Sequence, residues 1–225
     1  MALAASKSLP ALVEVTALSC NKIITITRQY GSGGHDIGQL LSEKLGIKFY
    51  DKELISLAAK ESDVDPEVFE QADEKPTNSL LYSLSVGLYN YGNGFGSMGD
   101  LPVNDKLYIA QHKVLKDLAA KEAFIVVGRC ADYVLKDYPN VIKVFIHADL
   151  DVRIQRALQE YDIEPARAKH AVVKADKNRA NYYSFYSGQK WGQADNYDLC
   201  INTTHLTIEQ AVEVIMNYVK VLEEK

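Results

Sequence analysis

Short runs of apolar residues recur along the chain and alternate with longer stretches of helical periodicity. The β-branched run at residues 23–27, IITIT, is typical of a buried strand. Residues 36–45 place an isoleucine and several leucines on one face, which predicts an amphipathic helix that ends at Gly46. The same reasoning predicts further strands at residues 47–50, 124–127, 141–146 and 199–202. It predicts further helices at residues 52–61, 106–120, 150–161, 164–186 and 207–222.

The alternation of strands and helices predicts an α/β fold, in which a parallel sheet carries helices on both faces. Ligands in such folds bind beyond the carboxyl ends of the strands. Features that follow strand ends are therefore expected near one cleft. They are the glycine-rich turn at residues 31–34, Asp51, the pair Gly128–Arg129, and the loop after Ile146. In that loop, Asp149 is expected to cap the next helix.

The segment YGSGGH, residues 30–35, connects the first predicted strand to the first predicted helix. Glycines let backbone N–H groups point inward, and the start of a helix adds partial positive charge. A strand, a glycine-rich turn and a helix in this order are therefore typical of a phosphate site. The alternative, a tight strand-to-helix turn without a ligand, stays open at this point.

The turn matches the phosphate-loop pattern GxxxxGK[ST] only in part. When the last glycine of the pattern is placed on Gly33, its lysine falls on Gly34 and its hydroxyl residue on His35. Its first glycine falls on Arg28. The lysine that bridges the terminal phosphates is therefore absent, so either another cation replaces it or ATP is not used in the usual way. The candidates for the replacement are Arg28, His35 and the basic stretch at residues 164–186.

Charge and cysteine content narrow the functional classes. The net charge of −5 argues against nucleic-acid binding, which requires a basic surface. The three cysteines lie far apart and form no CxxC pair, so we expect reduced thiols, a cytoplasmic location and no metal site built by the chain. Pro10 and Glu14 interrupt the apolar start of the chain, and no segment reaches 18 consecutive apolar residues, so we expect no membrane span.

We expect one domain at residues 22–225, preceded by a loose extension at residues 1–21. Residues 76–105 are rich in Gly, Asn, Ser and Tyr and show no sustained period, which predicts a flexible functional loop. An inert linker is the alternative for this segment. The sequence leaves open whether the chain forms a homo-oligomer.

Several segments of the chain are informative together. None is decisive alone, but their order and spacing along the chain are specific for one family. The segments are ITRQYGSGGHDIG from Ile26, FYDKELI from Phe49, VVGRCADYVL from Val126, KVFIHADLDVRIQR from Lys143, VKADKNRANYYSFYSGQKWG from Val173 and YDLCINTTHLTIEQAVEVI from Tyr197. By these segments the chain resembles the cytidylate kinase-like branch of the nucleoside monophosphate kinases. The resemblance implies a three-layer fold of the P-loop NTPase type with a helical lid at residues 164–192. It also implies phosphoryl transfer from ATP, with Mg²⁺, to a nucleoside monophosphate such as CMP.

The resemblance further implies roles for individual residues. Those that match the phosphate loop and its flanks are Arg28, Gly31, Ser32, Gly33, Gly34, His35 and Asp36. Those on the side of the acceptor substrate are Asp51 and Arg129, with Asp132 as a displaced carboxylate after the arginine. Those that act as catalytic cations are Arg153, on the helix that leads into the lid, and Lys177 and Arg179 in the lid itself. Arginine suits such tasks because its guanidinium binds phosphate oxygens bidentately.

Other interpretations stay open for some of these residues and for the activity. Asp51 could only cap the next helix, and Arg153 could lie on a solvated helix face. The missing lysine favours a non-catalytic module that binds a nucleotide or phosphate, whereas the retained arginines and the lid favour an enzyme. An interaction protein that uses residues 76–105 as a contact surface is a third alternative. Arg129→Ala is expected to weaken acceptor binding or turnover and to leave the melting temperature nearly unchanged, whereas a large loss of stability would make Arg129 structural.

Overall fold

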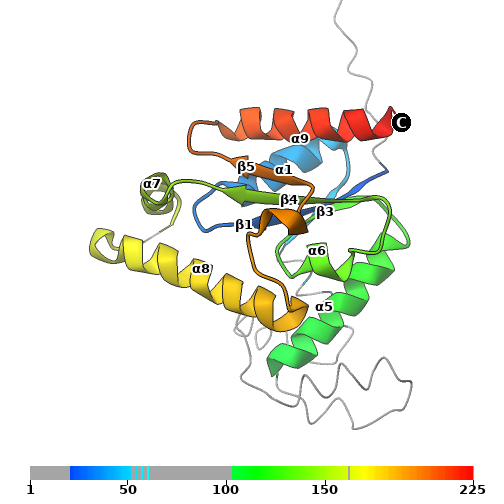
Figure 1. Ribbon diagram of the computed structural model, residues 1–225, viewed down its shortest axis with the longest axis horizontal. Coiled ribbons are helices and arrows are strands. Elements are labelled where there is room, and N and C mark those ends of the chain that lie inside the picture. Colours follow the sequence, from blue (N-terminus) through cyan, green and yellow to red (C-terminus); the bar gives the residue numbers. More distant parts are fainter. Residues whose placement is uncertain are drawn as a thin grey trace, which may run out of the picture.

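A sheet of five parallel strands forms the centre of the computed structural model, which describes residues 21–51, 54, 57, 60, 103–161 and 163–224 (Figure 1). The strands are β1 (Ile23–Arg28), β2 (Lys48–Tyr50), β3 (Phe124–Val127), β4 (Val141–His147) and β5 (Leu199–Asn202). Their order across the sheet is β2-β3-β1-β4-β5, and each neighbouring pair is parallel. β1 is therefore central, and its Ile26 pairs with Val127 of β3 and with Val144 of β4.

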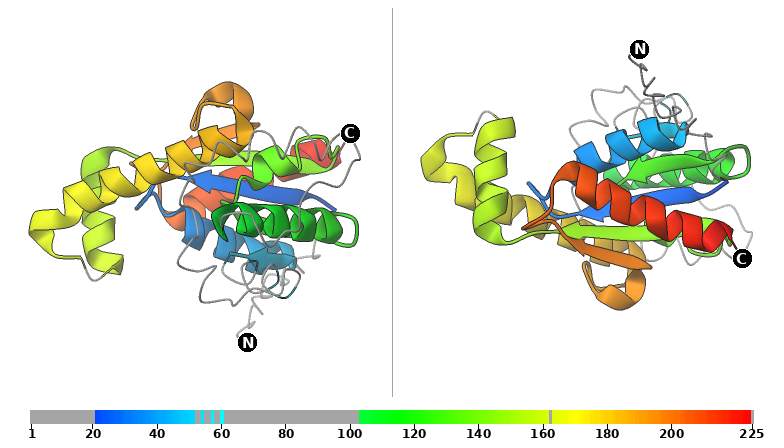
Figure 2. Two further views of the ribbon diagram at one scale, coloured as in Figure 1. Left: turned by 90° about the horizontal axis from the view of Figure 1, so that it is seen from below. Right: turned by 90° about the horizontal axis from the view of Figure 1, so that it is seen from above.

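Helices cover both faces of this sheet (Figures 1 and 2). They are α1 (Gly34–Leu45), α5 (Val103–Ala119), α6 (Ala131–Val134), α7 (Leu150–Glu160), α8 (Pro165–Ser187) and α9 (Ile208–Glu223), with a short 3-10 helix, η2 (Ala194–Asn196). Helices α1 and α9 pack on one face, and α5 and α6 pack on the other (Figure 1). α7 follows the end of β4, and α8 extends from there along the side that carries α6.

Two apolar clusters join the sheet to these helix layers. On one face, Ile24 of β1 packs in a cluster with Leu41 of α1 and Ile215 of α9. On the other face, Val126 of β3 packs in a cluster with Leu115 of α5. Full burial of one such aliphatic side chain stabilises the fold by about 2 kcal/mol. The layers thus fix the carboxyl end of β1, where the chain enters the glycine-rich turn.

The predicted fold class is confirmed, and the predicted strands and helices among the described residues are present with ends shifted by a few residues. Three details differ. Residues 103–105, expected to end the flexible loop, form the first turn of α5, where Asp105 Oδ1 accepts a hydrogen bond from Tyr186 Oη at 2.9 Å. Asp149 stands at the N-cap of α7, but its side chain makes no capping hydrogen bond. The short helices α6 and η2 were not predicted, because a single turn has no periodicity to detect.

Some predictions fall on parts of the chain that the structure does not describe. Residues 1–20 and 76–102 lie outside the described residues. Of the helix predicted at residues 52–61, the structure describes only residues 54, 57 and 60, and these three are helical. Within the described part of the chain, no helix combines the length and the hydropathy needed to cross a bilayer.

Candidate functional site

The glycine-rich turn after β1 has a left-handed backbone at two of its glycines. Gly31 and Gly33 have φ of 72° and 79°, in the left-handed region that glycine enters without strain. A Cβ on Gly31 would collide with the backbone carbonyl of Arg153, and a Cβ on Gly33 would lie 2.6 Å from Ile208 Cδ1. Glycine is therefore required at Gly31 by conformation and by the backbone packed against it, whereas at Gly33 the conformation is the main reason.

Hydrogen bonds from other segments hold this turn in place. Tyr30 N donates to Asp176 Oδ1 of α8 at 2.8 Å. The carbonyl of Ser32 accepts from Thr203 Oγ1 at 2.9 Å and from Arg156 Nη1 of α7 at 3.3 Å. Ser32 itself is fully buried. Because the turn is ordered by the protein, an anion that binds there does not have to order it.

A buried ion pair lies beside the turn, between α7 and α8. Arg153 Nη1 lies 2.5 Å from Asp176 Oδ2, and the two side chains are 8% and 15% exposed. The same nitrogen donates to Tyr30 O at 3.2 Å, and Arg153 Nε donates to Ala148 O at 2.9 Å. Arg153 is therefore buried, not on a solvated helix face, and it fastens both helices to the turn.

A cavity of about 440 Å³ adjoins the turn. Its lining residues are Arg28, Gln29, Tyr30, Gly31, Gly33, Gly34, His35, Asp36, Asp51, Glu160, Tyr161 and Arg179. The first residues of α1 belong to this lining, and Gly33 at the N-cap has no side chain to satisfy the first amides of the helix. Such amides and the helix dipole favour a bound anion. The cavity is therefore suited to phosphate.

The cavity wall carries both cations and carboxylates. Arg179 Nη1 donates to Arg28 O at 3.3 Å, and its guanidinium lies over the ring of Tyr30, 5.5 Å from the centroid. Partial burial, and then the Asp36 carboxylate, raises the pKa of Glu160 above its usual value. The cavity thus offers donors for phosphate oxygens and carboxylates that suit a hydrated cation.

The side chain of Arg28 occupies the space beside Gly34. A Cβ on Gly34 would lie 2.5 Å from Arg28 Cβ and 2.9 Å from Arg28 Cγ. Gly34 stands where the phosphate-loop pattern has its lysine. Because the Arg28 side chain fills this space, position 34 requires glycine.

Asp51, after β2, connects the turn to Arg129. Arg129 Nη2 donates to Asp51 Oδ1 at 3.0 Å, and the arginine side chain is only 4% exposed. On the other side, Asp51 Oδ2 lies 3.6 Å from His35 Nε2. The role of Asp51 is therefore more than that of a helix cap, because its carboxylate holds the buried arginine beside the start of α1.

Arg129 follows β3 through an unusual stretch of backbone. Gly128, Arg129 and Cys130 have φ of 76°, 62° and 53°. For a non-glycine residue this region costs about 1–2 kcal/mol, so the surrounding structure must enforce it. The stretch lines a small second pocket whose residues are Thr27, Arg28, Gly128, Arg129, Cys130, Arg179, Tyr183 and Trp191. Because Arg28 and Arg179 line both hollows, the pocket of Arg129 adjoins the main cavity.

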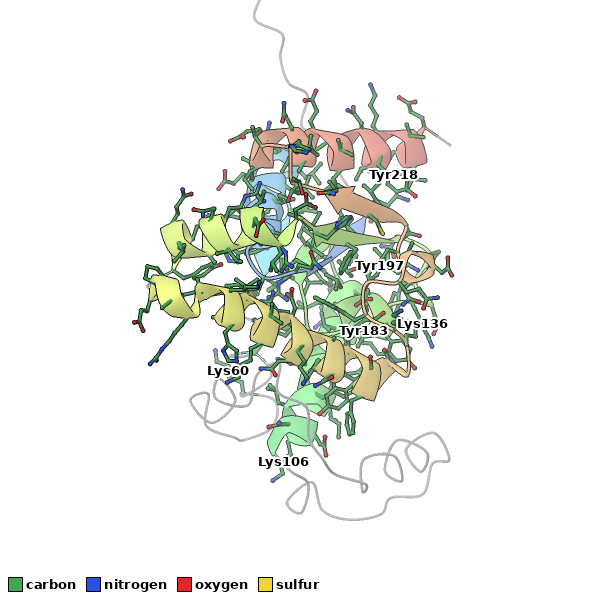
Figure 3. All side chains as sticks on the ribbon, turned by 60° about the vertical axis from the view of Figure 1, so that its left-hand side comes forward. Lys60, Lys106, Lys136, Tyr183, Tyr197 and Tyr218 are labelled. Atoms are coloured by element: carbon green, nitrogen blue, oxygen red, sulfur yellow. The ribbon has the colours of Figure 1, made fainter. Side chains whose placement is uncertain are left out.

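Asp132 is fully buried between β1, α6 and α8. Tyr183 Oη donates to Asp132 Oδ2 at 2.8 Å, and Thr27 Oγ1 donates to Asp132 Oδ1 at 3.4 Å. Burial raises the pKa of Asp132 to about 6, against the opposing effect of the hydrogen bond from Tyr183. Figure 3 shows Tyr183 between α8 and the rest of the domain, and the side chain is 3% exposed. The contacts of Asp132 therefore join three elements of the protein.

The structure brings most of the predicted site residues together. The main cavity is lined by Arg28, Gly31, Gly33, Gly34, His35, Asp36, Asp51 and Arg179, and the adjoining pocket by Arg129. Ser32, Asp132, Arg153 and Lys177 lie outside both linings, and Lys177 is exposed on α8. Sequence reasoning missed Glu160 and Tyr161, which line the cavity from the end of α7 and belong to no motif. The roles of all these residues in binding and catalysis stay predictions.

Comparison with known proteins connects this site to relatives. Residues 23–205 match the sequence profile of the cytidylate kinase-like family. The cytidylate kinase of Archaeoglobus fulgidus is 27% identical over 210 residues, which cover 90% of this chain and 97% of that protein. The cytidylate kinase of Methanosarcina barkeri is 25% identical over 193 residues, which cover 85% and 93%.

Solved structures share the same architecture. An uncharacterized protein from Eubacterium ventriosum has a TM-score of 0.65 and 29% identity, covering 88% of this chain and 98% of that one. The shikimate kinase of Acinetobacter baumannii has a TM-score of 0.52 and 16% identity, covering 93% and 98%, and it shows the fold alone. The sheet and its helices thus form the P-loop kinase fold that the sequence predicted. Since the family profile spans most of the chain, the protein belongs to the cytidylate kinase-like family.

Proposed function

We propose that the protein transfers the terminal phosphoryl group of ATP to a nucleoside monophosphate, with CMP as the first candidate acceptor. The observation that carries the proposal is the junction of two hollows, the phosphate-suited cavity at the glycine turn and the pocket of Arg129. Phosphoryl transfer depends mainly on positioning and on neutralising negative charge. A junction lined by arginines supplies both. The names of the two curated relatives support CMP as acceptor.

In this proposal, the triphosphate lies on the glycine turn. The amides at the start of α1 and the guanidinium of Arg179 bind its oxygens. The bonds from Thr203 and Asp176 keep the turn in shape before the nucleotide arrives. Arg153 takes a positioning role, since its described contacts are with Asp176 and with backbone carbonyls.

The acceptor phosphate is bound on the other side, by Arg129. Its guanidinium is oriented by Asp51 at 3.0 Å and by the left-handed backbone that follows β3. An arginine fixed before binding loses little conformational freedom when it takes a phosphate, so it positions the acceptor well. Helix α8, which carries Arg179 and Lys177, serves as the lid that excludes water from the junction.

The residues of the cavity fit Mg²⁺ bound together with ATP. Mg²⁺ keeps several waters and is held through one or two carboxylates plus the phosphates of the substrate. The carboxylates of Asp36, Asp51 and Glu160 line the cavity beside the glycine turn. When bound, the ion neutralises charge on the phosphates. His35 replaces the hydroxyl residue of the phosphate-loop pattern, so one usual contact to the ion is changed in this chain.

The proposal is tested with purified protein, MgATP and a panel of nucleoside monophosphates. ADP formation is followed with each acceptor, and the rate with ATP alone is subtracted. We expect at least one acceptor to raise ADP formation well above this background, with a matching nucleoside diphosphate as product. Binding of ATP without any acceptor-dependent turnover would contradict the proposal and favour a module that holds nucleotide without transfer.

A further inference from the structure

Arg28 and Gly34 occupy the two positions where the phosphate-loop pattern has a glycine and a lysine. Compared with the pattern, the glycine and the long cationic side chain have exchanged positions. A Cβ on Gly34 would lie 2.5 Å from Arg28 Cβ, closer than real carbon atoms approach, so a lysine at Gly34 would collide with the stem of Arg28. The two positions accommodate one long side chain between them, and this chain places it at the end of β1.

The backbone that carries Arg28 is firmly fixed. Arg28 is the last residue of the central strand β1, where it pairs with Ile146 of β4. Its carbonyl accepts a hydrogen bond from Arg179 Nη1 at 3.3 Å. The side chain of Arg28 therefore extends from rigid backbone, as the lysine of the usual pattern does at the start of a helix.

The location of Arg28 relative to the two hollows is equally specific. Arg28 and Arg179 are the residues that line both the cavity at the glycine turn and the pocket of Arg129. A phosphoryl group that moves from a donor on the turn to an acceptor at Arg129 passes this junction. A cation at the junction contacts the group that carries charge during transfer.

We propose that the guanidinium of Arg28 replaces the absent lysine and binds the terminal phosphates of the nucleoside triphosphate. The inference rests on the proposed function for the identity of the ligand, but not for the location of the cation. A guanidinium binds two oxygens in a fixed planar geometry, whereas an ammonium acts as a point charge. Arg28→Lys therefore retains the charge but loses the bidentate contact.

Binding of inorganic tripolyphosphate tests the location without requiring turnover. Isothermal titration calorimetry compares the wild type with Arg28→Met, which keeps the apolar stem beside Gly34 and removes the charge and the N–H donors. The control is Lys220→Met, at an exposed lysine of α9 outside both linings. A lost charge-assisted hydrogen bond corresponds to roughly 10–100-fold weaker binding. We expect that loss for Arg28→Met, an intermediate loss for Arg28→Lys, and affinity within about twofold of wild type for the control.

Variants that move the cation from position 28 to position 34 test whether the two positions share one task. Arg28→Gly should bind tripolyphosphate weakly, and Arg28→Gly combined with Gly34→Lys should recover most of the lost affinity. Gly34→Lys alone, with Arg28 in place, should lower the melting temperature because the two stems collide. A double variant that stays as weak as Arg28→Gly would overturn the claim that the two positions share one task.

Turnover separates this inference from the proposed function. If the wild type transfers phosphate, Arg28→Met should reduce kcat by roughly 100-fold or more, the scale for loss of one preorganised donor. Transfer by Arg28→Met at the rate of Lys220→Met would overturn the inference and leave the proposed function intact. Absence of transfer by the wild type would contradict the proposed function, and the tripolyphosphate affinities would still decide the role of Arg28. Melting temperatures of all variants show whether a loss comes from unfolding.

Discussion

Replacement of Asp132 by asparagine should make the protein more stable at neutral pH. The carboxyl group is fully buried, and burial raises its pKa from 3.8 to about 6. Its partners accommodate an amide, because Tyr183 can donate to the amide oxygen and Thr27 can accept from the amide nitrogen. Asp132→Asn therefore keeps the hydrogen bonds with Tyr183 and Thr27 and removes a buried charge.

The sign follows from proton linkage. Between about pH 4 and pH 6 the folded protein binds more protons at Asp132 than the unfolded chain does, so stability falls as the pH rises. The stabilising contribution is complete below about pH 4 and is lost above about pH 6. A pKa rise from 3.8 to about 6 corresponds to about 3 kcal/mol. We expect Asp132→Asn to exceed the wild type by up to that amount at pH 8 and by little at pH 4.

Urea unfolding at several values between pH 4 and pH 8 measures this difference. Asp137→Asn, at an exposed carboxylate in the segment that follows α6, is the matched control. The gain for Asp132→Asn relative to this control should increase with pH. A gain that does not change with pH, or a variant less stable than wild type at pH 8, would refute the argument from burial.

Three further substitutions test the supports of the site. Asp176→Ala leaves a buried guanidinium unpaired and should destabilise the protein by roughly 3–5 kcal/mol in urea unfolding; a loss below about 1 kcal/mol would show that the ion pair is unimportant. Gly31→Ala should lower stability by about 3 kcal/mol, whereas Gly46→Ala, also left-handed but with open space around a Cβ, should cost only about 1–2 kcal/mol. Equal losses would mean that close packing at Gly31 contributes nothing. Arg129→Ala should cost several kcal/mol because it leaves the carboxylate of Asp51 buried, and an unchanged melting temperature would contradict this.

The prediction for Arg129 differs from what its sequence suggests. An arginine that directly follows an apolar strand and a glycine indicates a binding residue on the surface of a cleft, where its removal changes stability little. The structure buries it to 4% exposure and pairs it with Asp51, a residue far away in the sequence. One side chain therefore combines a stabilising ion pair with the proposed role in binding, and Arg129→Lys, which keeps the charge, separates the two better than Arg129→Ala.

Local patterns were sufficient to predict the fold. The β-branched strands, the single apolar face of α1 and α9 and the glycine at the end of α1 each have a period or a residue type that determines the structure over a few residues. The ends of the parallel strands then brought the glycine turn, Asp51 and Arg129 to one region, as expected.

Contacts between distant residues could not be predicted in the same way. Asp176 reaches the turn only because α8 folds back over α7, and its ion pair with Arg153 could not be read from the sequence. Glu160 and Tyr161 line the cavity because α7 ends there. A side chain at position 34 would clash with Arg28 because of how β1 and α1 meet, and neither residue reveals this alone.

Transfer of a labelled phosphoryl group tests the central claim most directly. The protein is incubated with Mg²⁺, CMP and ATP labelled at the terminal phosphate, and the labelled products are separated. We predict that the label appears in CDP with the wild type and with Lys220→Met, and that its transfer falls by roughly 100-fold or more with Arg28→Met. Label that stays in ATP, or appears only as inorganic phosphate, while calorimetry shows bound ATP, would contradict the account.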